Sequence, residues 1–148
     1  MHAELTHLTN NTLETKIRNH IFMMDTQASA GGDNKGPSPK ELMIASVIGC
    51  TAMDVLAILK KHKMLPTKLT ISADAEPRAE HPRIFKGVDI LFVIEGAEIT
   101  SERVNEAIEA SLTKFCGVSA MISKIVPIRY RTQLNGQEIA HGEAKFQI

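Results

Sequence analysis

Apolar and polar residues alternate along several short runs of the chain, and a period of two residues is typical of a β-strand with one buried face. Near the N-terminus, residues 3–8 and 13–23 show a moderate alternation on either side of the turn dipeptide Asn10-Asn11. We therefore predict an N-terminal hairpin with four apolar side chains on one face: Leu13, Ile17, Ile21 and Met23.

Two central runs and the C-terminal end show the same period more clearly. Residues 68–76 alternate without interruption, and residues 84–95 carry apolar side chains at every second position from Val88 onward. The pair Asn135-Gly136 is a strong signal for a two-residue hairpin turn. These patterns predict two strands in the middle of the chain and a hairpin at its end.

A long helical pattern begins at Ser38. Ser38 as N-cap, Pro39 at the first helical position and Glu41 at the third position make a capping box, and Pro66 places the end of the helix near Lys63. The middle of the helix is apolar nearly all round, whereas a surface helix has one apolar stripe. A second subunit would cover such a helix most easily in a chain of 148 residues. The pattern therefore predicts an obligate homodimer.

A second helix is expected over residues 101–115, followed by a break at Gly117 and a short helix over residues 118–125. Its apolar stripe consists of Val104, Ile108, Leu112 and Phe115. The predicted order is β-β-α-β-β-α-α-β-β. This is an α+β fold with mainly antiparallel sheets around a long central helix, and residues 1–148 are expected to form a single domain.

Composition and charge narrow the range of partners. Seventeen Lys and Arg residues balance seventeen Asp and Glu residues, so no basic excess favours nucleic-acid binding. The longest uncharged apolar stretch, residues 42–53, is shorter than the ~20 residues that a membrane helix needs. The first 23 residues contain no apolar signal-peptide core. We therefore expect a cytoplasmic protein with neither a nucleic-acid partner nor a membrane partner.

The two cysteines are the main candidates for chemistry. Cys50 lies about three turns into the long helix, and Cys116 lies where the second helix breaks. Free cysteines are often buried, so both thiols could simply fill the core, or the fold could bring them together. A reactive thiol needs a lowered pKa, and Cys50 is too deep in its helix for the helix dipole to help. It would need a cation from another part of the chain.

The stretches around the two cysteines resemble the two cysteine motifs of the OsmC/Ohr family. Residues 36–42 and 49–55 carry the first motif, and residues 114–121 carry the second. Two such motifs 66 positions apart are much more specific than either motif alone, and the predicted order of elements agrees over essentially the whole chain. The likeness is greatest to an uncharacterised OsmC-like branch that carries a Cys-Thr-Ala-Met-Asp-Val stretch.

This resemblance implies a swapped, intertwined homodimer that acts as a thiol-dependent peroxidase of organic hydroperoxides. Cys50 would be the peroxidatic thiol, and Cys116 would be the resolving thiol that closes a disulfide with it. An external dithiol, either a small molecule or bound to a protein, would then reduce that disulfide. Two thiols and a reductant suffice, so the resemblance implies neither a metal nor an organic cofactor.

The residues that hold the thiolate in the family match less well. The family carries a glutamate ten positions before the first cysteine, whereas Lys40 stands there in this chain and the glutamate is Glu41. One position is about 100° of helix rotation, so Glu41 either serves this role or only completes the capping box with Ser38. The family also uses an N-terminal arginine. Arg18 is the candidate, with a solvated strand residue as the alternative, and Arg83 is a second candidate from a loop.

Two other functions remain open. One is a non-catalytic dimer that binds a small apolar or thiol-containing ligand, which the displaced glutamate favours. The other is a redox sensor or oxidoreductase that uses the same thiol pair without peroxide turnover. The retention of both cysteines favours the peroxidase. Apolar neighbours of the two thiols predict an apolar cleft and a preference for alkyl hydroperoxides: Val47, Ile48, Met53, Phe115, Val118 and Met121.

Overall fold

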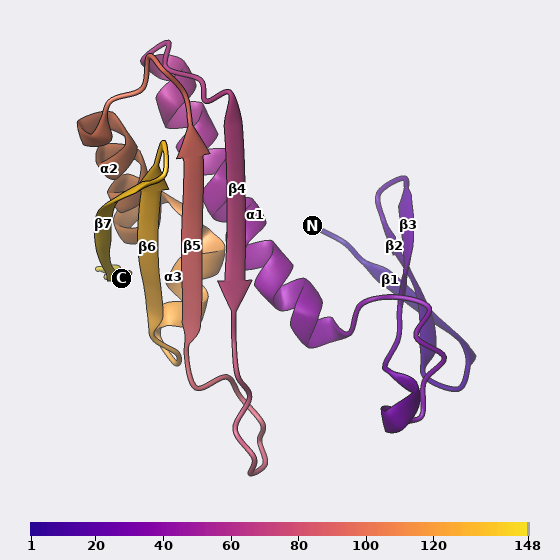
Figure 1. Ribbon diagram of the computed structural model, residues 1–148. Helices are drawn as coiled ribbons and strands as arrows, with labels where there is room; N and C mark the ends of the chain where they lie inside the picture. Colours follow the sequence, from indigo (N-terminus) through magenta and orange to yellow (C-terminus); the bar gives the residue numbers. More distant parts are fainter. Residues whose placement is uncertain (148) are drawn as a thin grey trace. The chain divides into compact units, whose positions relative to one another are not determined.

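The computed structural model describes residues 1–147, and these residues form two compact units, the first over Met1–Met43 and the second from Ile44 onward (Figure 1). The fold is α+β, as predicted, with one more N-terminal strand than expected. The elements are β1 (Glu4–Thr9), β2 (Thr12–Ile17), β3 (His20–Met24), the 3-10 turn η1 (Ala28–Ala30), α1 (Pro39–Lys61), β4 (Lys68–Asp74), β5 (Val88–Glu95), α2 (Ser101–Ala110), the π-helical turn η2 (Ser111–Phe115), α3 (Gly117–Ser123), β6 (Ile128–Leu134) and β7 (Gln137–Glu143).

The first unit contains an antiparallel sheet in the order β1-β2-β3. The turn at Asn10-Asn11 lies where the sequence predicts it, and Asn10 has a φ of 47°. The prediction of one strand over residues 13–23 is wrong, because a second turn at Arg18-Asn19 divides it. Arg18 has a φ of 55° and is therefore a turn residue, not a mid-strand residue.

The extra turn changes which side chains share a face of this sheet. Leu13 on β2 lies directly opposite Met24 on β3. Opposite residues project to the same face, and neighbours along a strand alternate. Ile21 and Met23 therefore lie on the other face from Leu13 and Ile17, and the prediction of a single apolar face for these four residues is wrong.

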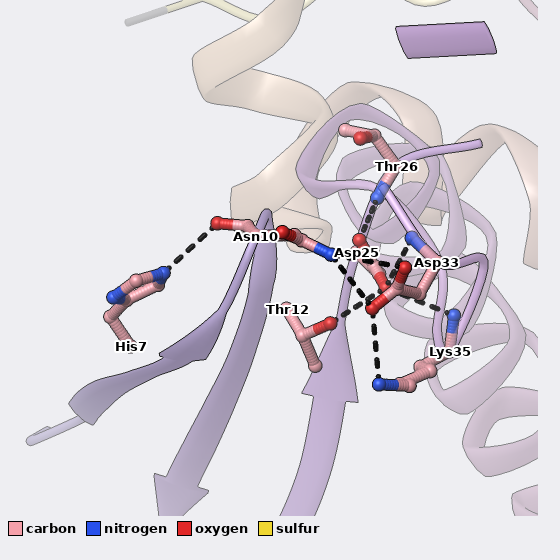
Figure 2. Close-up of polar contacts among 7 residues, drawn as sticks. All are labelled: His7, Asn10, Thr12, Asp25, Thr26, Asp33 and Lys35. Atoms are coloured by element: carbon pink, nitrogen blue, oxygen red, sulfur yellow. Dashed lines mark hydrogen bonds and ion pairs between the residues drawn. The ribbon is translucent and has the colours of Figure 1, made fainter. Parts of the chain in front are cut away.

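The segment between β3 and α1 folds around the carboxylate of Asp25, which is 2% exposed (Figure 2). The carboxylate accepts hydrogen bonds of 2.7–3.2 Å from four donors: the Thr12 hydroxyl and the backbone N–H groups of Thr26, Asp33 and Lys35. Burial alone would raise the pKa of Asp25, but these hydrogen bonds to the charged form outweigh it and lower the pKa. Asp25 therefore holds the loop together as a carboxylate.

The glycines of this loop are required by close backbone approaches. A Cβ at Gly36 would lie 2.2 Å from the carbonyl oxygen of Met23, and a Cβ at Gly32 would lie 2.1 Å from that of Thr26. Both distances are far below van der Waals contact. The segment is thus tightly packed, with its backbone against the end of β3.

Helix α1 begins with the predicted capping box. The Ser38 N–H donates to Glu41 Oε2 at 2.6 Å, and the Glu41 N–H is 3.4 Å from Ser38 Oγ. Lys60 and Lys61 lie in the last turn, where cations favour the helix dipole. The start of the helix and the basic residues at its end therefore confirm the sequence prediction.

Helix α1 buries only one stripe of side chains, at a spacing of four residues: Val47, Thr51, Val55 and Leu59. Other apolar side chains of the same helix are open to solvent, with Met53 74% and Leu56 37% exposed. The prediction that the helix is covered on several sides is therefore not met by residues 1–147 of a single chain.

By length and composition alone, α1 is apolar enough to cross a membrane. The core helix of a soluble protein meets the same criterion, and the buried stripe of α1 belongs to the core of the second unit. One such helix is weak evidence for a membrane span.

The second unit is built on a sheet in the order β4-β5-β6-β7, with the three helices on one of its faces (Figure 1). Strands β5 and β6 are parallel, because α2 and α3 lie in the connection between them, and the other pairs are antiparallel. The alternation predicted for residues 84–95 is confirmed over β5, where Val88, Ile90, Phe92 and Ile94 are buried. The Asn135-Gly136 turn joins β6 and β7, as predicted, with φ values of 49° and 83°.

The second helix is interrupted earlier than the sequence predicts. After α2, the backbone widens into the π-helical turn η2, which accommodates an extra residue. Val104, Ile108 and Leu112 are buried on the predicted stripe, but Phe115 is 53% exposed. The placement of Phe115 on that stripe is therefore wrong, because Phe115 is the last residue of the wider turn, where the helical periodicity has already shifted.

Candidate functional site

The structure brings Cys50 and Cys116 together within the second unit. Cys50 lies in the middle of α1, and Cys116 lies between η2 and α3. The two Sγ atoms and a carboxylate oxygen of Asp54 all lie within 4.8 Å of one another. Both cysteines are free thiols; Cys116 is buried and Cys50 is half-buried. The sequence left open whether the two thiols fill the core separately or are brought together by the fold, and the structure brings them together.

Cys116 owes its position to the break between the two helical segments. Its backbone is extended, with φ −69° and ψ 97°, and it forms the N-cap of α3. Its sulfur accepts the N–H of Ser119 at 3.3 Å and lies 3.1 Å from Ser119 Oγ. The Thr51 hydroxyl on α1 lies 3.5 Å from the same sulfur. Cys116 is thus held by polar groups from both helices, in a site with no exposed surface of its own.

Asp54 lies one helical turn after Cys50 on α1, so both side chains project from the same side of the helix. Its Oδ2 accepts a 2.9 Å hydrogen bond from the hydroxyl of Ser111, the fully buried first residue of the π-helical turn. The wide turn that rotates Phe115 outward therefore also supplies the residue that anchors Asp54 beside the thiols. π-helical turns are frequent at functional sites.

The surroundings of Cys50 favour the neutral thiol. Burial raises the pKa of Cys50, and both the hydrogen bond with Cys116 and the negative charges of Cys116 and Asp54 raise it further. The backbone of Val118 acts in the opposite direction but does not outweigh these effects. The charges that act on Cys50 here are thus acidic. None of these neighbours is the cation that would be needed to lower the pKa of Cys50.

The two expected activating residues lie in the first unit. The carboxylate of Glu41 is engaged in the capping box, and the hydrogen bonds from the Ser38 backbone and side chain lower its pKa despite a small opposing effect of burial. This is the alternative role that the sequence analysis left open. Arg18 lies on the exposed turn between β2 and β3, and Arg83 lies in the loop between β4 and β5.

A cleft of about 450 Å³ begins at Asp54 and runs between α1 and α2. Its lining combines apolar side chains with charged and ionisable ones: Asp54, Ala57, Ile58, Lys61, His62, Glu106, Ala110 and Phe115. Of the six residues expected to wall an apolar cleft at the thiols, only Phe115 lines this cleft, and neither cysteine does. Two of the others, Met53 and Met121, are 74% and 69% exposed. The apolar cleft at the thiols therefore stays a prediction.

Sequence reasoning missed the polar residues around the thiols. Asp54 could have been predicted from the sequence, because its spacing of four from Cys50 places both residues on one side of a helix. Ser111 and Ser119 carry no comparable signal, since the π-helical turn and the N-cap geometry at Cys116 bring them to the site.

The fold and the thiol pair define a class of small α+β proteins with one cysteine inside a long helix and a second at a helix break. The family model described as "OsmC-like protein" matches residues 32–131. The chain belongs to the OsmC-like family, which confirms the resemblance seen in the sequence.

Known relatives agree with this assignment. Protein YhfA of Escherichia coli K12 is 32% identical over 111 residues, which cover 75% of this chain and 80% of the relative. A hypothetical protein from Aquifex aeolicus VF5 has a TM-score of 0.80 at 22% identity, with 99% of this chain and 97% of that chain covered. An organic hydroperoxide resistance protein from Elizabethkingia anophelis has a TM-score of 0.69 at 19% identity, with 90% and 94% covered. The two structures show the shared fold, and the family suggests a redox role.

Proposed function

We propose that this protein is a two-cysteine peroxidase that reduces organic hydroperoxides to alcohols. The observation that carries the proposal is the pair of free thiols whose Sγ atoms lie within 4.8 Å of each other. Sulfurs at this separation can bond after small movements when the Cα atoms of the two cysteines lie within about 7 Å of each other. The family, together with a structural neighbour named as an organic hydroperoxide resistance protein, supports the choice of substrate.

The proposed reaction has three balanced steps. The Cys50 thiolate attacks the outer oxygen of the hydroperoxide, the O–O bond breaks, and the leaving alkoxide takes a proton to become the alcohol. Cys50 is then a sulfenic acid, and attack by Cys116 forms the disulfide and releases water. An external dithiol reduces this disulfide by two thiol–disulfide exchanges. The protein returns to its starting state without a metal or organic cofactor.

The raised pKa of Cys50 makes activation the critical requirement of this proposal. An opposite charge within about 4–6 Å lowers a thiol pKa by roughly 1–3 units, and each unit increases the thiolate fraction at neutral pH about tenfold. We retain Arg18 as the candidate cation, because the family resemblance implies an N-terminal arginine. Arg83 is the second candidate.

We expect Arg18→Gln to shift the alkylation of Cys50 by iodoacetamide to higher pH. Without the cation, the neighbouring groups alone set the pKa of Cys50. The rate of Cys50 alkylation at pH 7 should therefore fall at least about tenfold. The rate is followed by mass mapping of the Cys50 peptide from pH 6 to pH 10. Lys16→Gln, which removes a nearby charge from the same sheet, is the control and should leave the profile unchanged. A shift in Arg83→Gln but not in Arg18→Gln would assign the role to the loop arginine.

We expect cumene hydroperoxide to be reduced faster than hydrogen peroxide. Apolar walls stabilise an alkyl group by roughly 0.8 kcal/mol per buried methylene, and hydrogen peroxide has no such group. Four methylenes correspond to about 3 kcal/mol, or on the order of a hundredfold in kcat/KM. The measurement uses a small dithiol such as dihydrolipoamide as reductant. Equal kcat/KM values for both peroxides would contradict an apolar substrate site.

A binding protein of the same fold is the second candidate function. The observation in its favour is the burial of Cys50, which, together with its hydrogen bond to Cys116 and the acidic groups beside it, raises the pKa of a thiol that a peroxidase must deprotonate. Such a protein would hold a small apolar or thiol-containing ligand without turning over peroxide. No reaction with any hydroperoxide, together with saturable ligand binding, would favour it.

We further propose that the protein acts as a homodimer. The support is the uncovered apolar surface of each unit: Met53 and Leu56 on α1, and Leu5, which is 51% exposed, on the three-stranded sheet. Met53 and Leu56 are three positions apart on α1 and so share one side of the helix, and exposed apolar patches are typical of protein interfaces. A second copy would supply the cover that the pattern of the long helix predicts.

A further inference from the structure

The thiol pair lies beside a third donor that the peroxidase reaction does not use. Cys50, Asp54 and Cys116 each direct one ligand atom into the same small volume, with all three atoms within 4.8 Å of one another. Two thiolates and a carboxylate are a ligand set for a soft or borderline divalent cation. We propose that the reduced thiol pair and Asp54 together bind one divalent transition-metal ion, with zinc as the representative.

The separations fit such an ion. Zinc binds thiolate sulfur at about 2.3 Å and carboxylate oxygen at about 2.0–2.2 Å, so ligand atoms around a tetrahedral ion lie roughly 3.6–3.8 Å apart. The three atoms need to close by at most about 1.2 Å from their separations of up to 4.8 Å. Cys50 and Asp54 are half-buried, and small rotations of their side chains suffice for this closure. The fourth position around the ion is left for water or another exogenous ligand.

The groups behind the three donors form a supporting shell of the kind that metal sites need. Ser111 donates to Oδ2 of Asp54 at 2.9 Å and orients the carboxylate. The backbone N–H of Ser119 is directed at the sulfur of Cys116, and the Thr51 hydroxyl, which is 3.0 Å from the Val47 carbonyl oxygen, lies 3.5 Å from that sulfur. These donors stabilise negative charge on two of the three ligands before any ion arrives.

Charge and access also favour a cation. The charged groups that act on Cys50 are Cys116 and Asp54, so the fully ionised cluster would carry three negative charges within a partly buried site. A divalent cation neutralises two of them. Asp54 also lines the cleft between α1 and α2, so one of the three donors faces a cavity.

Metal binding and disulfide formation exclude each other in this proposal, because the disulfide consumes two of the three ligands. Oxidation of the metal-bound thiolates by a hydroperoxide would take two electrons from the sulfurs. It would consume two protons and release the alcohol, water and the free ion. The ion would therefore stay bound only while both thiols are reduced, and oxidation of the pair would release it.

The test is a titration of the reduced, metal-free protein with Co²⁺, which reports thiolate ligation through charge-transfer absorption in the near ultraviolet. We expect saturation at one Co²⁺ per chain and displacement by Zn²⁺. Cys116→Ser and Cys50→Ser should each weaken binding at least about 100-fold, and Asp54→Asn about 10–100-fold. Protein oxidised to the disulfide with diamide should show no charge-transfer band.

Glu106→Gln is the matched control, because it neutralises another carboxylate of the same cleft outside the donor cluster. It should bind Co²⁺ as the unchanged protein does. Circular dichroism of each metal-free variant checks that the fold is retained. No charge-transfer band in the reduced protein, or equal affinities in Asp54→Asn and Glu106→Gln, would overturn the proposed site. The titration needs no peroxide, so a protein that binds Co²⁺ but leaves hydroperoxides intact would contradict only the peroxidase proposal.

Discussion

Cys50→Ser is expected to abolish hydroperoxide consumption completely, because no nucleophile remains to attack the O–O bond. Cys116→Ser is expected to complete one turnover and then stop, since the sulfenic acid on Cys50 has lost its resolving partner. Single-turnover consumption of cumene hydroperoxide, with dimedone trapping of the sulfenic acid, measures both effects. The expected yields are no alcohol from Cys50→Ser and one equivalent from Cys116→Ser.

The double variant is the control for reaction at other side chains, and it should consume no hydroperoxide. One turnover by Cys50→Ser and none by Cys116→Ser would reverse the two roles. Cys116 is fully buried and Cys50 is half-buried, so the exposure of the sulfurs favours Cys50 as the thiol that meets the substrate.

A charge on the exposed apolar side of α1 is expected to dissociate the proposed homodimer. Met53→Asp and Leu56→Asp would each place an unpaired carboxylate in the interface, and burial of such a charge costs several kcal/mol. The dissociation constant should rise at least about 100-fold. Light scattering and sedimentation at micromolar concentration measure the change, and an obligate interface should bury more than about 2,000 Å².

The same kind of substitution at an exposed loop position distinguishes loss of the dimer interface from a general effect of an added charge on solubility. Ala97→Asp, in the loop after β5, is the control and should remain dimeric. Val55→Asp is not informative, because Val55 is fully buried within its own unit and the charge would unfold the core. Unchanged protein that sediments as a monomer would contradict the homodimer and leave the exposed side of α1 without an explanation.

Much of the fold follows from local patterns in the sequence. The capping box at Ser38, the alternation over β5 and the Asn135-Gly136 turn each specify their element, because the relevant interactions lie within a few residues of one another. Errors arise where one residue changes the periodicity. The turn at Arg18-Asn19 divides a predicted strand. The π-helical turn that ends at Phe115 moves this residue off the apolar face of the second helix. Neither position carries a glycine or proline that would have marked it.

The sequence identifies the two thiols of the site but not most of the residues that surround them. The family motifs indicate Cys50 and Cys116, and the fold brings the two thiols together. The partners of these sulfurs come from long-range packing. Ser111 reaches Asp54 across 57 positions of sequence, and Thr51 reaches Cys116 across 65. No local pattern records such contacts, so the groups that hold Asp54 and Cys116 in place emerge only from the three-dimensional arrangement.

The central claim is that Cys50 and Cys116 act as a peroxide-reducing pair. Intact-mass spectrometry of the reduced, metal-free protein before and after one equivalent of cumene hydroperoxide tests it most directly. We predict a loss of about 2 Da, from the two thiol protons, and a single Cys50–Cys116 disulfide in the peptide map. An unchanged mass, or a disulfide between chains in place of the one within the chain, would contradict the claim.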